Sequence, residues 1–400
     1  MKEILIKEVH ELKEELIRHR RYLHAHAEVG FDLKQTYSYV YKQLSDMGYA
    51  VHDCGKCGLY VEAGHKEPIF LLRADMDALP IIDKTDLDFK SENNMHACGH
   101  DFHAAMMLGA AKILKKHENE LKGTVRIMFQ PAEEIFEGAK NMIDHGVIEN
   151  VSAGLMMHVV SGSDLKTGSV MVSDGGVNAP AADIFTIEVN GKGCHGSTPQ
   201  LGIDALNSAA HILIALQEIS ARELAGSDEV ILTIGSLNAG EAPNAIANKA
   251  VMKGTLRTFD EDLRAHVKER MAEIIDYTSK AFRTESSLTF TSGTPSLKND
   301  DKLSESVYKH TLEILGSDYC FTSSILNNDK PARLGGSEDF AYISRQIPII
   351  TLTLGCGNIN DGYTYPLHHP CVLFDEEGLV NGCLAYVYNA MMWLNENNRD

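Results

Sequence analysis

Hydrophobic residues recur along this chain with two different periods, and the change between them predicts its secondary structure. Apolar positions are spaced as in a helix over residues 4–24 and again over 36–47. Two strands are expected next, over 58–62 and 69–73. The second of these is continuously apolar up to Arg73, as is typical of a strand buried on both faces of a sheet.

The same alternation continues through the following residues. The expected elements are a helix, a strand, a helix and a strand, over about 103–116, 124–129, 138–146 and 153–157. Strands that alternate with helices favour an α/β fold whose central sheet is largely parallel. A strand over 349–354 and a helix over 375–395 return to this sheet near the end of the chain.

The pattern changes between residues 183 and 292. The expected order is strand, helix, strand, strand, helix, strand, at about 183–189, 203–224, 230–236, 250–258, 261–283 and 287–291. This order is a split βαβ arrangement of ferredoxin-like type. We therefore expect a metal-binding α/β domain formed by residues 1–182 and 293–400, with an inserted α+β domain over 183–292.

Length and charge narrow the class of protein. A chain of 400 residues suits two domains. The 37 Lys and Arg against 56 Asp and Glu give a net charge of −19, which disfavours nonspecific binding to nucleic acid or anionic lipid. The charged N-terminus lacks the apolar stretch of a signal peptide, and no apolar run approaches the roughly 20 residues that cross a bilayer. We expect a cytoplasmic protein.

Residues 95–103 (MHACGHDFH) gather ligand-type side chains around a glycine. Cys98 and His100 could converge on one metal ion if the backbone turns sharply at the glycine between them. Thiolate, imidazole and carboxylate ligands suit Zn²⁺ or a similar borderline ion, and Asp101 could orient a ligating imidazole. The alternative is a helix start, with Asp101 as its N-cap and His103 in its first turn.

Further candidates directly follow the expected strands. Asp75 and Asp77 come after one strand, Glu133 and Glu134 after the next, and His158 after a third. Because open α/β sheets bind ligands at the carboxyl edge of their strands, we expect these side chains to lie close together.

The adjacent glutamates can play different roles, because neighbours in an extended segment point in opposite directions. One can bind a metal ion while the other takes a proton from a water molecule. The alternative for Glu133 and Glu134 is a solvated helix N-terminus, where acids are favourable. For His158 the alternative is a hydrogen-bonded histidine of the core.

Residues 191–196 match the G-x-G-x-x-G pattern, which makes a dinucleotide-binding oxidoreductase the main rival interpretation. The segment 197–202 separates these glycines from the next helix, so no helix N-terminus would meet a pyrophosphate. The next strand also ends without an acid for a ribose. We interpret the segment as a loop that presents His195 to a site elsewhere.

Several other residues are candidates whose role the sequence leaves open. Arg257 could bind a substrate carboxylate as a fork, or form a surface ion pair. Gly336 could let the backbone approach a ligand, although residues 337–339 look like a helix N-cap followed by acids. Asn244 lies in a loop of the inserted domain, and two histidines stand together at 368–369.

A series of motifs resembles a known family. In chain order they are Arg21-Tyr22-Leu23-His24 with Glu28-Val29-Gly30-Phe31, RADMDALP from Arg73, MHACGHDFH, FQPAEE, His158, GKGCHGSTP, GTLRTF, GGSEDF and LHHP. Together they resemble the amidohydrolase branch of the di-metal aminoacylase/carboxypeptidase family. That branch includes aminoacylases, hippurate hydrolases, auxin-conjugate hydrolases and N-acetyl-diaminopimelate deacetylases. The resemblance runs from about residue 18 to 390.

The resemblance implies a metal-binding α/β domain and an inserted domain used for dimerisation. It implies two divalent ions per subunit, either Zn²⁺, Mn²⁺, Ni²⁺ or Co²⁺. Their implied ligands are Cys98, His100, Glu134, His158 and His368. Glu133 would be the general base, and Asp77 would orient a metal ligand.

For the inserted domain, the resemblance implies contacts with the substrate. His195 would reach the active site of the partner in a homodimer and polarise the scissile carbonyl group. Asn244 and Arg257 would help to hold the substrate carboxylate. The family pattern has a frequent serine where this chain has His369, so both neighbouring histidines are candidate ligands. We prefer His368 because it holds the family position.

The implied function is metal-dependent hydrolysis of the amide bond of N-acyl L-amino acids, with an acetyl or aromatic acyl group. The products would be a carboxylate and a free amino acid. The closest alternative is a metallo-carboxypeptidase or dipeptidase acting on short peptides. A more remote alternative is a non-catalytic metal-dependent binding protein, which would have no need of a general base at Glu133.

Overall fold

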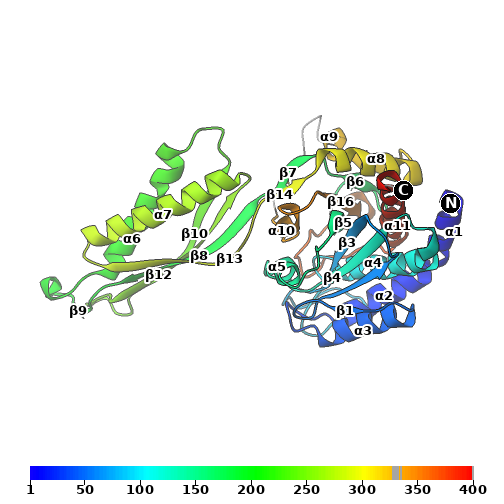
Figure 1. Ribbon diagram of the computed structural model, residues 1–400. Coiled ribbons are helices and arrows are strands. Elements are labelled where there is room, and N and C mark those ends of the chain that lie inside the picture. Colours follow the sequence, from blue (N-terminus) through cyan, green and yellow to red (C-terminus); the bar gives the residue numbers. More distant parts are fainter. Residues whose placement is uncertain (327–332, 334–335, 399–400) are drawn as a thin grey trace. The chain divides into compact units, whose positions relative to one another are not determined.

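The computed structural model describes residues 1–326, 333 and 336–398, and the chain forms two compact units (Figure 1). Unit 1 comprises Met1–Asn178, Lys298–Ala332 and Glu338–Asp400. Unit 2 comprises Ala179–Leu297 and Arg333–Ser337, so it is inserted into unit 1. Each unit has its own hydrophobic core.

The main sheet of unit 1 has the strand order β1-β2-β4-β3-β5-β16-β6-β15. The strands are β1 His52–Asp53, β2 Leu59–Ala63, β3 Ile69–Asp75, β4 Thr124–Gln130, β5 Val151–Val160, β6 Val170–Val172, β15 Cys320–Thr322 and β16 Ile349–Gly355. The central strands β4, β3, β5 and β16 pair in parallel, whereas β2 and β6 pair antiparallel with β4 and β16. The predicted α/β fold with a mostly parallel central sheet is confirmed.

Two largely buried helices, α4 and α11, pack on each other and on β3. The helices of unit 1 are α1 Lys2–Glu11, α2 Lys13–Ala25, α3 Lys34–Asp46, α4 His100–Lys116, α5 Gly138–Ile143, α8 Asp301–Leu315, α9 Ser323–Leu326, α10 Ala341–Ser344 and α11 Gly378–Asn397. Because most of their residues are buried, α4 and α11 cover the central strands from one side. None of the helices in the described part of the chain combines the length and apolar composition needed to span a bilayer.

Unit 2 is built on an antiparallel sheet with the order β10-β12-β8-β13. Its larger elements are β8 Ala181–Asn190, α6 Ala205–Glu218, β10 Val230–Ala239, β12 Lys249–Thr258, α7 Glu261–Ala281 and β13 Glu285–Thr294. Figure 1 shows α6 and α7 side by side along one face of this sheet. Half-buried and exposed residues alternate along β10, and Ile231 is 62% exposed, so the edge strand presents apolar side chains to solvent.

Short strands complete the structure. In unit 2, β9 (Cys194–His195) pairs with β11 (Ala245–Ile246). Where the chain leaves and re-enters unit 1, β7 (Gly176–Ala179) pairs with β14 (Leu297–Asn299).

Candidate metal centre and active site

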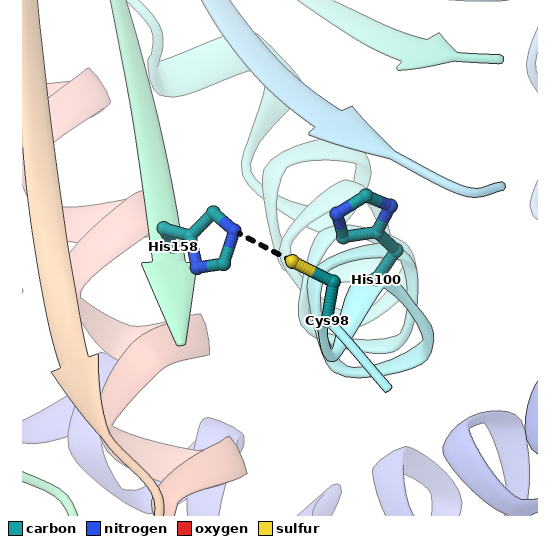
Figure 2. A group of neighbouring side chains, drawn as sticks. All are labelled: Cys98, His100 and His158. Atoms are coloured by element: carbon teal, nitrogen blue, oxygen red, sulfur yellow. Dashed lines mark hydrogen bonds between the residues drawn. The ribbon is translucent and has the colours of Figure 1, made fainter. Parts of the chain in front are cut away.

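The ligands expected in unit 1 meet at the carboxyl edge of its parallel strands. Figure 2 shows Cys98 and His100 at the start of α4 and His158 on β5, with His158 Nε2 3.5 Å from Cys98 Sγ. Gly99 lies between the first two with φ +85°, and a Cβ there would lie 2.3 Å from a methyl carbon of Val159. Glycine is therefore required both by the left-handed backbone and by the close packing of α4 on β5.

The loop after β16 adds His368. Its Nε2 lies 3.2 Å from Cys98 Sγ and 3.5 Å from Glu134 Oε1. The neighbouring His369 turns elsewhere, because its ring stacks on Tyr365 with the centroids 4.3 Å apart. The geometry thus brings His368, and not His369, to the other candidate ligands.

Two buried atoms in this group make no hydrogen bond with any described residue. They are His100 Nε2 and Glu134 Oε1, which lie 3.9 Å apart. A buried polar atom without a partner is unfavourable, so both atoms require something in the space between them. His100 Nδ1 already pairs with the backbone oxygen of Asp77 at 2.9 Å, which leaves Nε2 for an ion.

The candidate ligand atoms form overlapping groups whose members lie within 4.8 Å of one another. These groups are Cys98–His100–His158, Cys98–Glu134–His368 and His100–Glu133–Glu134. Thiolate, imidazole and carboxylate donors suit borderline divalent ions. The residues therefore fit a pair of neighbouring ions.

The Asp77 carboxylate holds the backbone of Glu133 and Glu134. Its Oδ1 accepts the Glu133 N–H at 3.0 Å, and its Oδ2 accepts the Glu134 N–H at 3.2 Å. The side chain is fully buried and also lies 3.5 Å from His100 Nδ1. One carboxylate thus contacts three of the candidate residues.

Burial sets the protonation of the candidate residues. Burial raises the pKa of the Cys98 thiol, so a thiolate there depends on a nearby cation. Burial lowers the pKa of His158 to about 3, so its ring is neutral at pH 7 and keeps a lone pair. Burial, together with the nearby Glu338 and Asp339, raises the pKa of Glu133 well above its usual range.

Arg73 is a structural residue of the site that was not predicted from the sequence. This side chain is 1% exposed and forms ion pairs with Asp75, with Glu338 at 2.8 Å and with Asp339 at 2.9 Å. A buried guanidinium needs such partners, because an unpaired buried charge is costly. The signal was present in the sequence, since an arginine in a fully buried strand predicts buried acids nearby.

The segment Ser337-Glu338-Asp339 corrects an interpretation made from the sequence, because Glu338 and Asp339 do not cap a helix. Helix α10 begins only at Ala341 and has no side-chain cap. Asp339 Oδ2 instead accepts the Ala139 N–H at 2.8 Å, while Glu338 binds Arg73. A charge-assisted pair with a buried arginine is stronger than a cap on a helix of one turn.

In unit 2, the structure brings His195 and Asn244 together. Strands β9 and β11 pair His195 with Ala245, and the Gly196 N–H donates to the Asn244 backbone oxygen at 2.7 Å. Both His195 and Asn244 are exposed. The His195 ring is oriented by the Ser197 hydroxyl, 2.7 Å from its Nδ1.

Arg257 lies far from this pair within unit 2. At roughly 3.3 Å per residue, the strand from Lys249 to Arg257 spans about 26 Å, and Asn244 precedes its other end. The Arg257 guanidinium donates to Ser337 Oγ at 3.2 Å. Gly336 is exposed beside that serine, and Gly335 lies outside the described residues.

Comparison with known proteins gives matches over most of the chain. The model of peptidase family M20/M25/M40 matches residues 71–391. An N-acetyl-L-cysteine deacetylase of Bacillus subtilis (strain 168) is 34% identical over 395 residues, 96% of this chain and 90% of that protein. An IAA-amino acid hydrolase of Arabidopsis thaliana, ILR1-like 4, is 34% identical over 387 residues, 94% of this chain and 85% of that protein.

A solved structure is also similar. It is a dinuclear metal binding peptidase of the M20 family from Bacillus subtilis, with a TM-score of 0.78 and 31% sequence identity. The match covers 96% of this chain and 99% of that one.

Proposed function

The chain belongs to peptidase family M20/M25/M40, and on that basis we propose that it hydrolyses N-acyl L-amino acids with the help of two divalent ions. The observation that carries the proposal is the meeting of five ligand-type side chains beside a buried glutamate at one sheet edge. The ligands are Cys98, His100, Glu134, His158 and His368. The similar deacetylase and auxin-conjugate hydrolase support an N-acyl amino acid as the substrate.

Bound ions would supply Lewis acidity, which polarises the scissile carbonyl and lowers the pKa of the attacking water. The protein supplies position and proton transfer. Glu133 takes a proton from the water and then gives it to the amide nitrogen as the C–N bond breaks. Asp77 holds the backbone of Glu133 and Glu134, so both carboxylates keep a fixed direction during these steps.

We further propose a homodimer in which His195 acts on the partner's substrate. An N-acyl amino acid is much shorter than the distance of about 26 Å between the two ends of β12, so one copy of unit 2 cannot hold one substrate with both His195 and Arg257. Two copies remove this conflict if one supplies Arg257 and the other supplies His195 with Asn244. Arg257 would then bind the substrate carboxylate as a fork, and His195 would donate to the developing oxyanion.

The surface of unit 2 supports association. β10 is an edge strand of its sheet, and its exposed face carries Ile231. On the adjacent α6, Ile214 is 66% exposed. Exposed edges and apolar patches are typical of protein interfaces. The proposal also includes a reducing compartment such as the cytoplasm, because Cys98 must act as a thiolate rather than in a disulfide.

The test is a substrate panel with controlled metal content. We would measure amino acid release from N-acetyl, N-benzoyl and indole-3-acetyl amino acids and from unblocked dipeptides. Each would be assayed after chelation and after return of Zn²⁺, Mn²⁺, Co²⁺ or Ni²⁺. We expect chelation to abolish release and metal to restore it, with N-acyl amino acids preferred. Preference for dipeptides would favour the carboxypeptidase alternative, and no release at full metal occupancy would overturn the proposal.

A further inference from the structure

The strands β3 and β5 separate just before the candidate metal centre. They pair in parallel only as far as Arg73 and Met156. Beyond this point β3 continues to pair with β4, and β5 continues to pair with β16. The N–H groups of Met157 and Val159 therefore lose the partners that a continuous sheet would supply, and buried N–H groups need replacements.

Side chains from two helices fill the space where β3 and β5 separate. Tyr386 of α11 accepts the Met157 N–H at 2.9 Å and donates to the Arg73 backbone oxygen at 3.2 Å. His103 of α4 accepts the Val159 N–H on its Nε2, also at 2.9 Å. Both side chains are fully buried, so Met157 and Val159 each donate their N–H to a buried side chain.

The hydrogen bonds of His103 define its tautomer. Because His103 Nε2 accepts an amide proton, the ring proton must be on Nδ1, and Nδ1–H donates to Asp75. Arg73 holds Asp75 in turn. His103 lies in the same sequence motif as Cys98 and His100, but its Nε2 lone pair already accepts the Val159 N–H. This histidine is therefore available to orient other groups rather than to bind an ion.

Val159 connects His103 to His158. The Val159 N–H is held by His103, while the Val159 backbone oxygen lies 2.7 Å from His158 Nδ1. That oxygen can only accept, so His158 carries its proton on Nδ1 and directs the lone pair of Nε2 toward Cys98 Sγ. The rings of His103 and His158 also meet edge to face, with centroids 4.7 Å apart and planes at 74°.

We propose that His103, fixed by Asp75, is a positioning residue that sets the orientation and tautomer of His158. It acts by holding the backbone of Val159 through its N–H, while the carbonyl oxygen of the same residue selects the protonated nitrogen of His158. The inference rests on the proposed function, in which His158 is a metal ligand. Residues that orient a metal-binding imidazole typically change metal affinity by about 10–100-fold when they are replaced.

The test compares three variants of the full-length protein. His103→Phe keeps a ring of similar size but removes both hydrogen bonds. His103→Gln keeps an acceptor for the Val159 N–H. Tyr386→Phe is the matched control, because it removes the hydrogen bonds of Tyr386 to Met157 and Arg73 and keeps those that His103 and His158 make with Val159. We would measure Zn²⁺ affinity by competition with a chromophoric chelator, the absorption spectrum with Co²⁺ bound, and Tm without metal.

We expect His103→Phe to weaken one of two Zn²⁺ sites by about 10–100-fold and to alter the Co²⁺ spectrum. His103→Gln should recover part of both. Tyr386→Phe should lower Tm by an amount comparable with His103→Phe and keep wild-type Zn²⁺ affinity. If His103→Phe does not fold, the comparison of His103→Gln with Tyr386→Phe decides in the same way.

Equal Zn²⁺ affinities in the His103 and Tyr386 variants would overturn the inference. That result is expected if His103 only supports the fold and does not orient His158. Wild-type protein that binds two ions while the His103 variants also bind them normally would sink the inference alone. Wild-type protein that binds no divalent ion would sink the proposed function as well.

Discussion

Unit 1 keeps most of its candidate chemistry buried, whereas unit 2 presents His195 and Asn244 on the surface. Cys98, His100 and Glu133 are buried, and the buried Asp77 holds the last two, although the proposed ligand His368 is exposed. His195 and Asn244 are exposed and are oriented by short local contacts. The difference shows that ligand geometry must be set in advance by packing, whereas a group that meets the substrate can sit on a loop.

This contrast makes opposite predictions for the two units. Replacements of the proposed ligands in unit 1, or of the groups that hold them, should alter metal binding or stability together with turnover. Replacements at the exposed residues of unit 2 should alter turnover alone.

The largest expected effect is on Glu133, which is buried but is not a proposed ligand. Glu133→Gln should lower kcat by about 10²–10⁴-fold, because the proton acceptor is lost. Bound metal should stay at the wild-type level, since the proposed ligands are intact. Kinetics on an N-acetyl amino acid and metal analysis would check this, with the exposed Glu269→Gln on α7 as a control. A near-normal kcat would remove Glu133 from the mechanism.

Replacing one ion-paired arginine in each unit compares the stability of the two units. Arg73→Met leaves buried acids without their cation and should destabilise unit 1 by about 3–5 kcal/mol. In unit 2, Arg264 is 15% exposed and pairs with Asp183 at 2.7 Å. Arg264→Met should cost about 1.5–3 kcal/mol, since charged hydrogen bonds are lost nearer to solvent.

Hydrogen exchange would separate these effects. Arg73→Met should speed exchange in β3 and β4 peptides, and Arg264→Met should do so in β8 and α7 peptides. If each variant loosened both units equally, the two units would not be energetically independent.

The exposed His195 tests the opposite behaviour. His195→Ala should reduce kcat by about 10²–10³-fold, as expected for loss of an oxyanion donor, without changing Tm or metal content. Mixing it with Glu133→Gln under subunit exchange should restore up to about a quarter of wild-type activity, because one site of each mixed dimer is complete. A mixture with no more activity than its components would argue against action in the partner's site.

The smallest expected effect concerns the pH dependence of unit 1. Burial alone would lower the pKa of His24, but hydrogen bonds to Asp101 at 2.8 Å and Asp83 at 3.1 Å raise it above its usual value. A raised folded pKa means that this stabilisation is complete below about pH 6.5 and is lost as pH rises through the folded value. Urea midpoints at pH 6 and pH 9 should differ less in His24→Gln than in wild type. An unchanged difference would show that other groups control the slope.

Much of the fold followed from local patterns in the sequence. The apolar run before Asp75 predicted a buried central strand, and β3 occupies that place. The helical pattern over 4–24 was misleading, since α1 and α2 break at Leu12, where no glycine or proline marks an interruption. Helix α8 was missed, although Asp300 caps it by accepting the Leu303 N–H. That signal was available in the sequence.

The sequence by itself determined which donor types are present and that they lie at or near the ends of successive expected strands, because hydrophobic periodicity is a local property. Only the tertiary structure decided which donors face the same space. His368 rather than His369 meets Cys98, and the Nε2 of His103 is taken by Val159. The physical reason is that the lone pair of an imidazole goes to whichever group packing brings beside it, and here those groups come from distant parts of the chain.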